Sequence, residues 1–484
     1  MAINWKRLLA GILASATLVG AMLTLGSCGN DTDGNEGETK GEKETISSDS
    51  AYGSLEKTKY NKDFVIYKRD ESDKCDFEVE KITGDVLDDA LFDRNTIVAE
   101  DYGITFVYYE NSYDKINEDL KLQVDGGLYD YDLYVGHKSS MKNLAQNNYL
   151  YDLASITDLD LTASWWDALC RENMTVDGKT YLMTGDIFPS SMVITSCLTF
   201  NKKMFKDWNL TEPFALVDEG KWTAAEFTAL LTDATRDKNG DGKVKPEDDI
   251  YGMTTWMMDV PYSLFYGMGG MFSTINEDEQ PELSYDDVDI VDRYEAIYDM
   301  IVTKQSYFIT VESDYSKNYE VFSDGRALFC DMTLGKISDF LLDMTDPYGI
   351  VPMPKFDANQ KNYLSFVNGA TPLVMIAKNC KDPDFVGTIL DAMGAYNKDK
   401  VTPTIFENVT KLKAAQDPDS ARMVDKVLEH RVYDFAYFAD LSVADIVRVQ
   451  LIAGQPNISS KIRSEGASSK LQLRRLMSDW NKAD

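Results

Sequence analysis

The chain has 484 residues, of which 44% are hydrophobic and 27% are charged, and its formal net charge is -32. This length and composition indicate two or three domains with a sizeable core, whereas the acidic balance excludes nucleic acid as a partner, because phosphate backbones require a basic surface. Only two histidines are present, which excludes an H-E-x-x-H metal site and disfavours a Ser-His-Asp triad.

The N-terminus has the pattern of an export signal. Lys6 and Arg7 precede an uncharged run that ends in Leu25-Gly26-Ser27-Cys28, and a basic start followed by a short apolar run is typical of a secretory signal rather than a membrane span. The residues before Cys28 resemble the bacterial lipoprotein signal, in which the cysteine carries acyl chains such as palmitate. We therefore expect a signal peptide at 1–27 and an extracytoplasmic protein held on the bacterial cell membrane by a lipid on Cys28. The alternative is an ordinary secretion signal with an incidental cysteine.

Residues 28–60 are polar and acidic and contain almost no large apolar side chains. Such a composition cannot bury enough apolar surface to fold. The sequence therefore predicts a disordered tether at 28–60, with the folded body beginning at residue 61.

The first part of the body alternates strands and helices. The expected elements are strands at 64–67, 104–109 and 131–135 and helices at 85–99 and 113–124. This order is typical of βαβ units and a mainly parallel sheet. Ligands of open α/β sheets bind beyond the carboxyl ends of the strands, which makes His137, directly after one strand, a candidate ligand contact. The alternative is an ordinary exposed histidine in a loop.

Aromatic residues gather in three later segments. Trp165 and Trp166 are adjacent, so both cannot point into one core from the same face; at least one is either a ligand platform or a wedge between lobes. Trp256 ends an expected strand at 250–256, and Tyr262 follows it closely. These segments are candidates for the rim of a binding site.

Two extended segments, 192–200 and 366–377, are longer than ordinary strands and suit crossings between two lobes. The predicted domains are therefore interleaved. Lobe 1 comprises 61–191 and 367–435, and lobe 2 comprises 192–366 and 436–484.

The segment 237–248 matches the pattern of a calcium-binding loop. Oxygen-bearing side chains occupy positions 1, 3 and 5, a glycine occupies position 6, and a carboxylate stands at position 12. The predicted Ca²⁺ ligands are Asp237, Asn239, Asp241, Lys243 (through its backbone carbonyl) and Asp248. Aspartate replaces the usual glutamate at position 12 and a lysine occupies position 9, so an Asx-rich turn without an ion is the alternative.

The cysteines beyond Cys28 are scattered and odd in number: Cys75, Cys170, Cys197, Cys330 and Cys380. This spacing indicates neither a zinc site nor a dense disulfide framework. We expect buried free thiols and leave the pairing open.

Several short motifs resemble, in their order along the chain, the family 1 extracellular solute-binding lipoproteins of ABC importers, which include maltodextrin receptors. The motifs are Tyr151-Asp152-Leu153, Trp165-Trp166-Asp167, Gly185-Asp186-Ile187, Phe200-Asn201-Lys202-Lys203, Gly220-Lys221-Trp222-Thr223, Gly325-Arg326-Ala327-Leu328-Phe329 and Gly349-Ile350-Val351-Pro352. The resemblance implies a two-lobed α/β fold of the periplasmic-binding-protein type, with hinge crossovers, a helical C-terminus and a ligand between the lobes.

The resemblance also implies a function. The expected protein is a monomer and not an enzyme, and it captures a small solute, most simply an oligosaccharide, and delivers it to the permease subunits of an ABC transporter. Tyr262, Asp331 and Met332 fall in rim positions that resemble sugar-contacting places in the maltodextrin receptors. We expect Trp166 or Trp256 to stack on the ligand and Asp331 to accept hydrogen bonds from hydroxyl groups. An exported hydrolase that uses a pair of carboxylates is the main alternative, and a peptide or other metabolite as ligand is a third.

Overall fold

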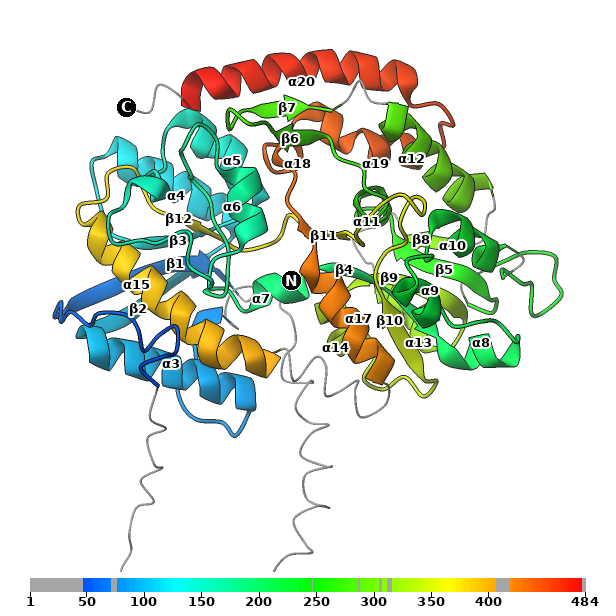
Figure 1. Cartoon of the computed structure of the whole chain (residues 1–484), viewed down its shortest axis with the longest axis horizontal. Coiled ribbons are helices and arrows are strands. Elements are labelled where there is room, and N and C mark those ends of the chain that lie inside the picture. Colours follow the sequence, from blue (N-terminus) through cyan, green and yellow to red (C-terminus); the bar gives the residue numbers. More distant parts are fainter. Residues whose placement is uncertain are drawn as a thin grey trace, which may run out of the picture.

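The structure is a computed structural model that describes residues 47–70, 76–232, 234–245, 247–284, 288–303, 307–310, 316–405 and 418–480. It contains two lobes side by side, each built on a β-sheet flanked by helices, and a long C-terminal helix, α20 (Ser459–Trp480), lies across both (Figure 1). The predicted two-lobed α/β fold is confirmed. The predicted signal peptide and the predicted lipid anchor at Cys28 lie outside the described residues. Within the described ranges, none of the helices is both long and apolar enough to cross a membrane.

Lobe 1 contains a four-stranded sheet in the order β12-β3-β1-β2. Its strands are β1 (Lys62–Arg69), β2 (Ile104–Asn111), β3 (Leu133–Gly136) and β12 (Leu373–Met375). β1, β2 and β3 are parallel, and β12 pairs antiparallel with β3. The βαβ units that the sequence predicts at residues 64–135 are therefore present.

The helices of this lobe are α3 (Val86–Tyr102), α4 (Tyr113–Asp125), α5 (Lys138–Asn143), η1 (Ala145–Asn147), η2 (Leu153–Ser155), α6 (Ala168–Met174), α15 (Pro383–Tyr396) and the π-helix η4 (Asn397–Val401). Local signals set their ends. The side chain of Asp85 accepts hydrogen bonds from the first N–H groups of α3, and Gly103, at φ 60°, ends it in the left-handed conformation that favours glycine.

Lobe 2 contains a five-stranded sheet in the order β10-β4-β9-β5-β8. Its strands are β4 (Ser196–Asn201), β5 (Tyr251–Trp256), β8 (Tyr307–Thr310), β9 (Ala327–Thr333) and β10 (Tyr348–Val351). β5 is parallel to β8 and β9, whereas β4 runs antiparallel to β9 and β10. The rings of Phe205, Trp222 and Phe227 pack around Phe329 of β9 and form the core on one face.

The other elements of this lobe are α8 (Lys202–Asp207), α9 (Phe214–Asp218), α10 (Ala224–Leu231), α11 (Val260–Gly267), the hairpin β6 (Ser273–Ile275) and β7 (Pro281–Leu283), α12 (Val288–Tyr298), the π-helix η3 (Asp299–Thr303), α13 (Ser316–Ser323) and α14 (Leu334–Phe340). The C-terminal elements before α20 are α17 (Pro418–Glu429), β13 (Arg431–Val432), α18 (Phe435–Phe438), η5 (Ser442–Asp445) and α19 (Ile446–Ile452).

The chain crosses between the lobes in two predicted places, but neither crossing is one continuous strand. Helix α7 (Ser190–Val193) interrupts the first, so that β4 begins only at Ser196. A turn in which the N–H of Thr371 donates to the carbonyl of Asn368 divides the second into β11 (Ser365–Phe366) and β12. The crossings meet through a bridge between Thr195 and Val367, and β11 also pairs with β13. The hinge is thus a compact three-segment joint (Figure 1).

The folded body begins before residue 61, contrary to the predicted tether boundary. Tyr52 is 1% exposed, packs edge-on against Tyr396 at 5.3 Å and donates its hydroxyl to Asp101. The N–H groups of Ala51 and Tyr52 donate to Asp399. Together with the ring of Tyr60, which packs edge-on against Phe385 at 4.7 Å, these contacts attach residues 47–60 to lobe 1.

Two C-terminal boundaries also differ from the prediction. Helix α17 lies on lobe 2, not lobe 1, because Ser420 accepts a hydrogen bond from the N–H of Ile350 in β10 and the apolar face of the helix is buried there. The end of the chain returns to lobe 1: the indole N–H of Trp480 donates to the carbonyl of Val176 at 3.1 Å. Helix α20 therefore ties the two lobes together instead of belonging to lobe 2.

Candidate ligand-binding cleft

A cavity of about 510 Å³ lies between the lobes at the carboxyl ends of their parallel strands. From lobe 1 it is lined by Arg69 at the end of β1 and Asp70 after it, Ser112 and Tyr113 after β2, and His137 after β3. Lobe 2 contributes Trp256 at the end of β5, Thr333 at the end of β9, Tyr319 of α13, and Gly335 and Lys336 of α14. The hinge contributes Ser190, Val193, Ile194, Asn368 and Ala370. Ligand sites of open α/β sheets lie at this edge.

On the wall formed by lobe 1, an aromatic ring is stacked on a neutral histidine. Tyr113 is 43% exposed, and its ring lies parallel to that of His137 at 4.8 Å. His137 begins α5, where its Nδ1 accepts the N–H of Ser139. Burial, with the nearby charges of Arg69 and Lys138, lowers the pKa of His137 to about 3. The imidazole is therefore uncharged near neutral pH and offers the cleft a fixed, neutral surface.

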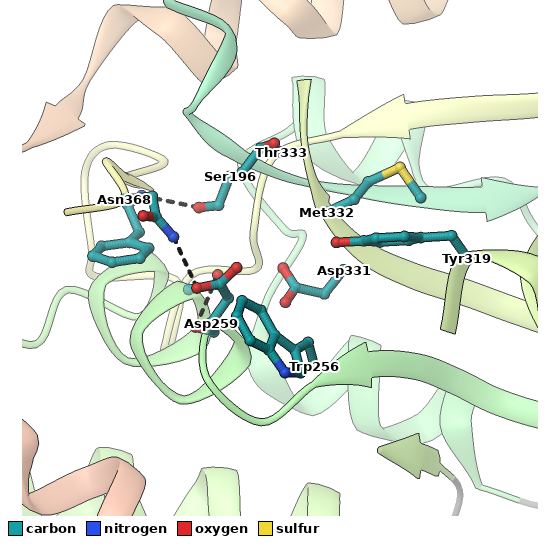
Figure 2. Close-up of a pocket in the computed structure, with 10 residues that line it drawn as sticks. Ser196, Trp256, Asp259, Tyr319, Asp331, Met332, Thr333 and Asn368 are labelled. Atoms are coloured by element: carbon teal, nitrogen blue, oxygen red, sulfur yellow. Dashed lines mark hydrogen bonds between the residues drawn. The ribbon is translucent and has the colours of Figure 1, made fainter. Parts of the chain in front are cut away.

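Lobe 2 places two carboxylic side chains at the floor of the cleft. Figure 2 shows the carboxyl groups of Asp259, just before α11, and Asp331, in β9, pointing toward each other beside Trp256. Asp259 accepts a hydrogen bond from the amide of Asn368 at 2.8 Å, and Asp331 accepts one from the hydroxyl of Thr255 at 3.0 Å. A hollow of about 10 Å³ lies here, and its lining also includes Tyr319 and Met332.

The two carboxyl groups hold protons unusually tightly. Burial, reinforced by the facing charge of Asp259, raises the pKa of Asp331 to about 7. Burial also raises the pKa of Asp259 to about 6, although Lys336 and the hydrogen bond from Asn368 act in the opposite direction. Burial and the repulsion between the two carboxylates disfavour a second negative charge in this confined space. The pair therefore retains about one proton near neutral pH.

Trp165 and Trp166 do not line the cleft, although the sequence analysis selected them as candidate ligand contacts. They are 8% and 4% exposed, and both indole N–H groups donate to one carboxylate oxygen of Asp391, at 2.7 and 2.8 Å. They line a separate depression with Lys398 and Arg431. Both indole rings can be buried because Asp391 accepts the hydrogen bonds of both N–H groups. This explains how adjacent tryptophans are accommodated in lobe 1.

Tyr262 is also absent from the lining of the cleft, in contrast to the prediction. Its ring is 6% exposed and stacks on Phe366 of the hinge at 5.4 Å, and its hydroxyl donates to Asp445. Trp256, His137 and Asp331, by contrast, stand at the cleft or its floor, and Met332 lines the small hollow.

The acidic loop at 237–248 lies apart from the cleft and is stabilised by its own backbone. The carboxylate of Asp237 accepts the N–H groups of Gly240 and Gly242, both at 2.7 Å. Asp241 accepts from the ammonium group of Lys245 at 3.0 Å. Across the part of the chain that the structure describes, no three His, Cys, Asp or Glu side chains are grouped to hold a metal ion.

The described cysteines are free thiols, as expected: Cys170, Cys197 and Cys330 are buried and Cys380 is partly buried. Cys75 lies outside the described residues.

A family model described as bacterial extracellular solute-binding protein matches residues 96–393. This span includes the whole sheet of lobe 2, the strands β2, β3 and β12 of lobe 1 and most of the cleft, whereas β1 precedes it. The chain belongs to this family. No sequence among the curated proteins matches it significantly. Membership of an extracellular family agrees with the export that the N-terminal sequence predicts.

Solved structures of solute-binding proteins share the fold of this one at low sequence identity. The maltose/maltodextrin-binding domain MalE of Bdellovibrio bacteriovorus, bound to maltotriose, is 17% identical with a TM-score of 0.54, covering 85% of this chain and 100% of that one. An ABC substrate-binding protein of Listeria monocytogenes in complex with cycloalternan is 13% identical with a TM-score of 0.53, covering 85% and 99%. A solute-binding protein of Thermotoga lettingae bound with α-D-tagatose is 15% identical with a TM-score of 0.53, covering 86% and 100%.

Sequence reasoning missed several residues that line the cleft of this solute-binding protein. Tyr113 follows the helical spacing of a core residue, yet it stands at the first turn of α4 and faces the cavity. Asp259 and Asn368 sit in segments without a motif. The rule that ligands bind beyond the carboxyl ends of parallel strands, applied to β2 as it was to β3, would have selected Tyr113 beside His137.

Proposed function

We propose that this solute-binding protein captures an oligosaccharide in the cleft and delivers it to the permease of an ABC importer. The observation that supports the proposal is a cavity of about 510 Å³ with aromatic and polar side chains from both lobes, a size within the usual range for small-molecule sites. Structural relatives were solved with maltotriose and cycloalternan bound.

The arrangement of the cleft suits a sugar. Faces of C–H bonds on a pyranose ring pack on aromatic rings, and Tyr113 of lobe 1 and Trp256 of lobe 2 provide such rings on opposing walls. Asp70, Lys336 and Asn368 supply hydrogen-bonding groups for the hydroxyls. Closure of the lobes would bring both walls onto one ligand.

The same geometry supports binding over hydrolysis. A glycosidase needs a glycosidic bond between two carboxyl groups. The facing carboxyl groups of Asp259 and Asp331 border a hollow of about 10 Å³, which holds about one water molecule. A glycosidic linkage is much larger than this hollow.

A thermal-shift screen against mono- and oligosaccharides tests the proposal. A ligand that binds only the folded protein raises its melting temperature in proportion to the logarithm of concentration over Kd. We expect an oligosaccharide to raise it, and chromatography of that sugar after incubation to recover it unchanged. A screen without any stabilising sugar, or a sugar that is cleaved, would contradict the proposal.

For Cys28, we propose the lipid anchor that the preceding residues predict. Replacing Cys28 with alanine removes the acylated atom, so the protein should shift from the membrane fraction to the soluble fraction after cell fractionation. Replacing Ser27 with alanine keeps a small residue before the cysteine and serves as the control. A wild-type protein found in the soluble fraction, without lipid on Cys28, would disprove the anchor.

We also propose that the loop at 237–248 binds Ca²⁺, with Asp237, Asn239, Asp241 and Asp248 and the carbonyl of Lys243 as ligands. The ion would neutralise carboxylates that otherwise repel one another, and it would have to displace Lys245 from Asp241. Addition of a chelator should lower the melting temperature of the wild-type protein and leave that of Asp241→Ala unchanged. Identical melting curves with and without chelator would eliminate the site.

A further inference from the structure

The hollow beside the cleft is a distinct subsite with an incompletely satisfied acceptor. Asp331 is 4% exposed, and while its Oδ2 accepts from Thr255, its Oδ1 accepts no hydrogen bond from the described protein. Figure 2 shows this carboxyl group directed into the space shared with Asp259. A buried acceptor without a donor is costly. Once the proton shared with Asp259 has left, this oxygen therefore requires a donor from outside the protein.

The hollow adjoins the main cavity, with which it shares several lining residues: Trp256, Asp259, Tyr319, Thr333 and Asn368. Its volume of about 10 Å³ is enough for one small group, such as a water molecule. A group at the end of a ligand in the cleft can therefore enter it, whereas a ring cannot.

The charges around the hollow favour a cation. The carboxyl groups of Asp259 and Asp331 face each other (Figure 2). The positive charge of Lys336 lowers the pKa of Asp259, but the ammonium nitrogen of Lys336 also lies 3.5 Å from a carboxylate oxygen of Asp339. Hydrogen bonds from the hydroxyl groups of Thr255 and Ser263 lower the pKa of Asp331. Burial and the nearby charge of Asp259 raise the pKa of Tyr437 in α18. The ring of Trp256 forms part of the wall, and indole faces attract cations.

We propose that this hollow binds a protonated primary amine of the ligand, so that the oligosaccharide carried by this protein is an amino sugar. An ammonium group fits the volume, donates three hydrogen bonds and supplies the missing positive charge, whereas a hydroxyl donates one and supplies none. The inference rests on the proposed function and specifies the ligand of the same cleft.

Entry of the ammonium group has a measurable consequence for protons. Without it the two carboxyl groups share about one proton near neutral pH. The ammonium takes the place of that proton, which passes to the buffer, and both carboxylates remain ionised against the new cation. Binding of an amino sugar is therefore accompanied by proton release, whereas binding of a neutral sugar is not.

Calorimetry on the whole protein at about pH 6.5, where a sugar amine is protonated, tests the inference with three probes: a trisaccharide of β-1,4-linked glucosamine, its fully N-acetylated counterpart, and maltotriose. We expect the glucosamine trisaccharide to bind at least about tenfold more tightly than either neutral probe. Titrations in two buffers of different ionisation heat should report proton release for that probe alone.

Asp331→Asn removes the charge and keeps the shape, and it should abolish both the preference and the proton release. Asp259→Asn removes the other charge and should reduce the preference in the same way. Asp343→Asn changes an exposed aspartate of the same lobe and should leave the preference intact. Melting curves of each variant verify that it is folded.

The outcomes separate this inference from the proposed function. Neutral trisaccharides that bind as tightly as the amine, or a preference that survives in folded Asp331→Asn, would overturn the amine subsite while the saccharide function stands. If none of the sugars in the screen and none of the three probes binds, the proposed function fails and the inference fails with it.

Discussion

Trp256→Ala should weaken oligosaccharide binding by about thirtyfold or more, equivalent to about 2 kcal/mol. Trp256 ends β5, so the sheet holds its backbone, and its ring borders both the main cavity and the small hollow. A rigid aromatic side chain at the centre of a site contributes more than residues at its edge. Isothermal calorimetry with a sugar identified by the thermal-shift screen measures the change.

A matched control is Trp208→Ala in the same lobe. Trp208 is partly buried and stacks under Arg236 at 3.9 Å, and it does not line the cleft. We expect its replacement to leave affinity within about twofold. An unchanged affinity for Trp256→Ala, with the fold intact, would move the sugar away from this wall of the cleft.

Asp331→Asn should stabilise the protein at about pH 8 by on the order of 2–4 kcal/mol, and the gain should disappear as the pH falls. The pKa of Asp331 is raised from 3.8 to about 7 in the folded state. The folded protein therefore holds this proton more tightly than the unfolded chain, and the resulting stability is lost as pH rises between these two values. Asparagine resembles the protonated acid at every pH.

Urea unfolding of the wild type and Asp331→Asn across this pH range measures the difference. It should be largest above about pH 7 and close to zero near pH 4. Asp343→Asn, an exposed change of the same charge, should show almost no such difference. A pH-independent difference, or a loss of stability at high pH, would contradict the assignment of a buried proton to the pair.

Local patterns in the sequence determined the elements and their order. The alternation of strands and helices predicts the parallel sheet of lobe 1, and the structure has β1, β2 and β3 in that arrangement. Because carboxyl ends of parallel strands meet at one edge, the same reasoning placed His137 near the cleft, and the clustering of aromatic residues selected Trp256. Hydrophobic periodicity is a local property, so these features did not require knowledge of distant contacts.

The boundaries of the lobes depended on packing between segments far apart in sequence. Tyr52 joins lobe 1 through Tyr396 and Asp399. Helix α17 joins lobe 2 through its buried apolar face and a hydrogen bond from the N–H of Ile350 in β10 to Ser420. The amphipathic pattern of a helix shows that it packs, but it does not identify the surface that receives it.

The identity of the site residues was likewise decided by tertiary structure. From the sequence, a tryptophan is equally consistent with a ligand platform and with a core residue. Trp165 and Trp166 are buried because Asp391, more than two hundred residues later, accepts both of their indole N–H groups. Asp259 became notable only through its position opposite Asp331. The sequence by itself determined an exported α/β solute-binding fold with a cleft at the strand ends; which side chains face that cleft was decided by long-range contacts, because the exposure of a side chain is a property of its neighbours in space.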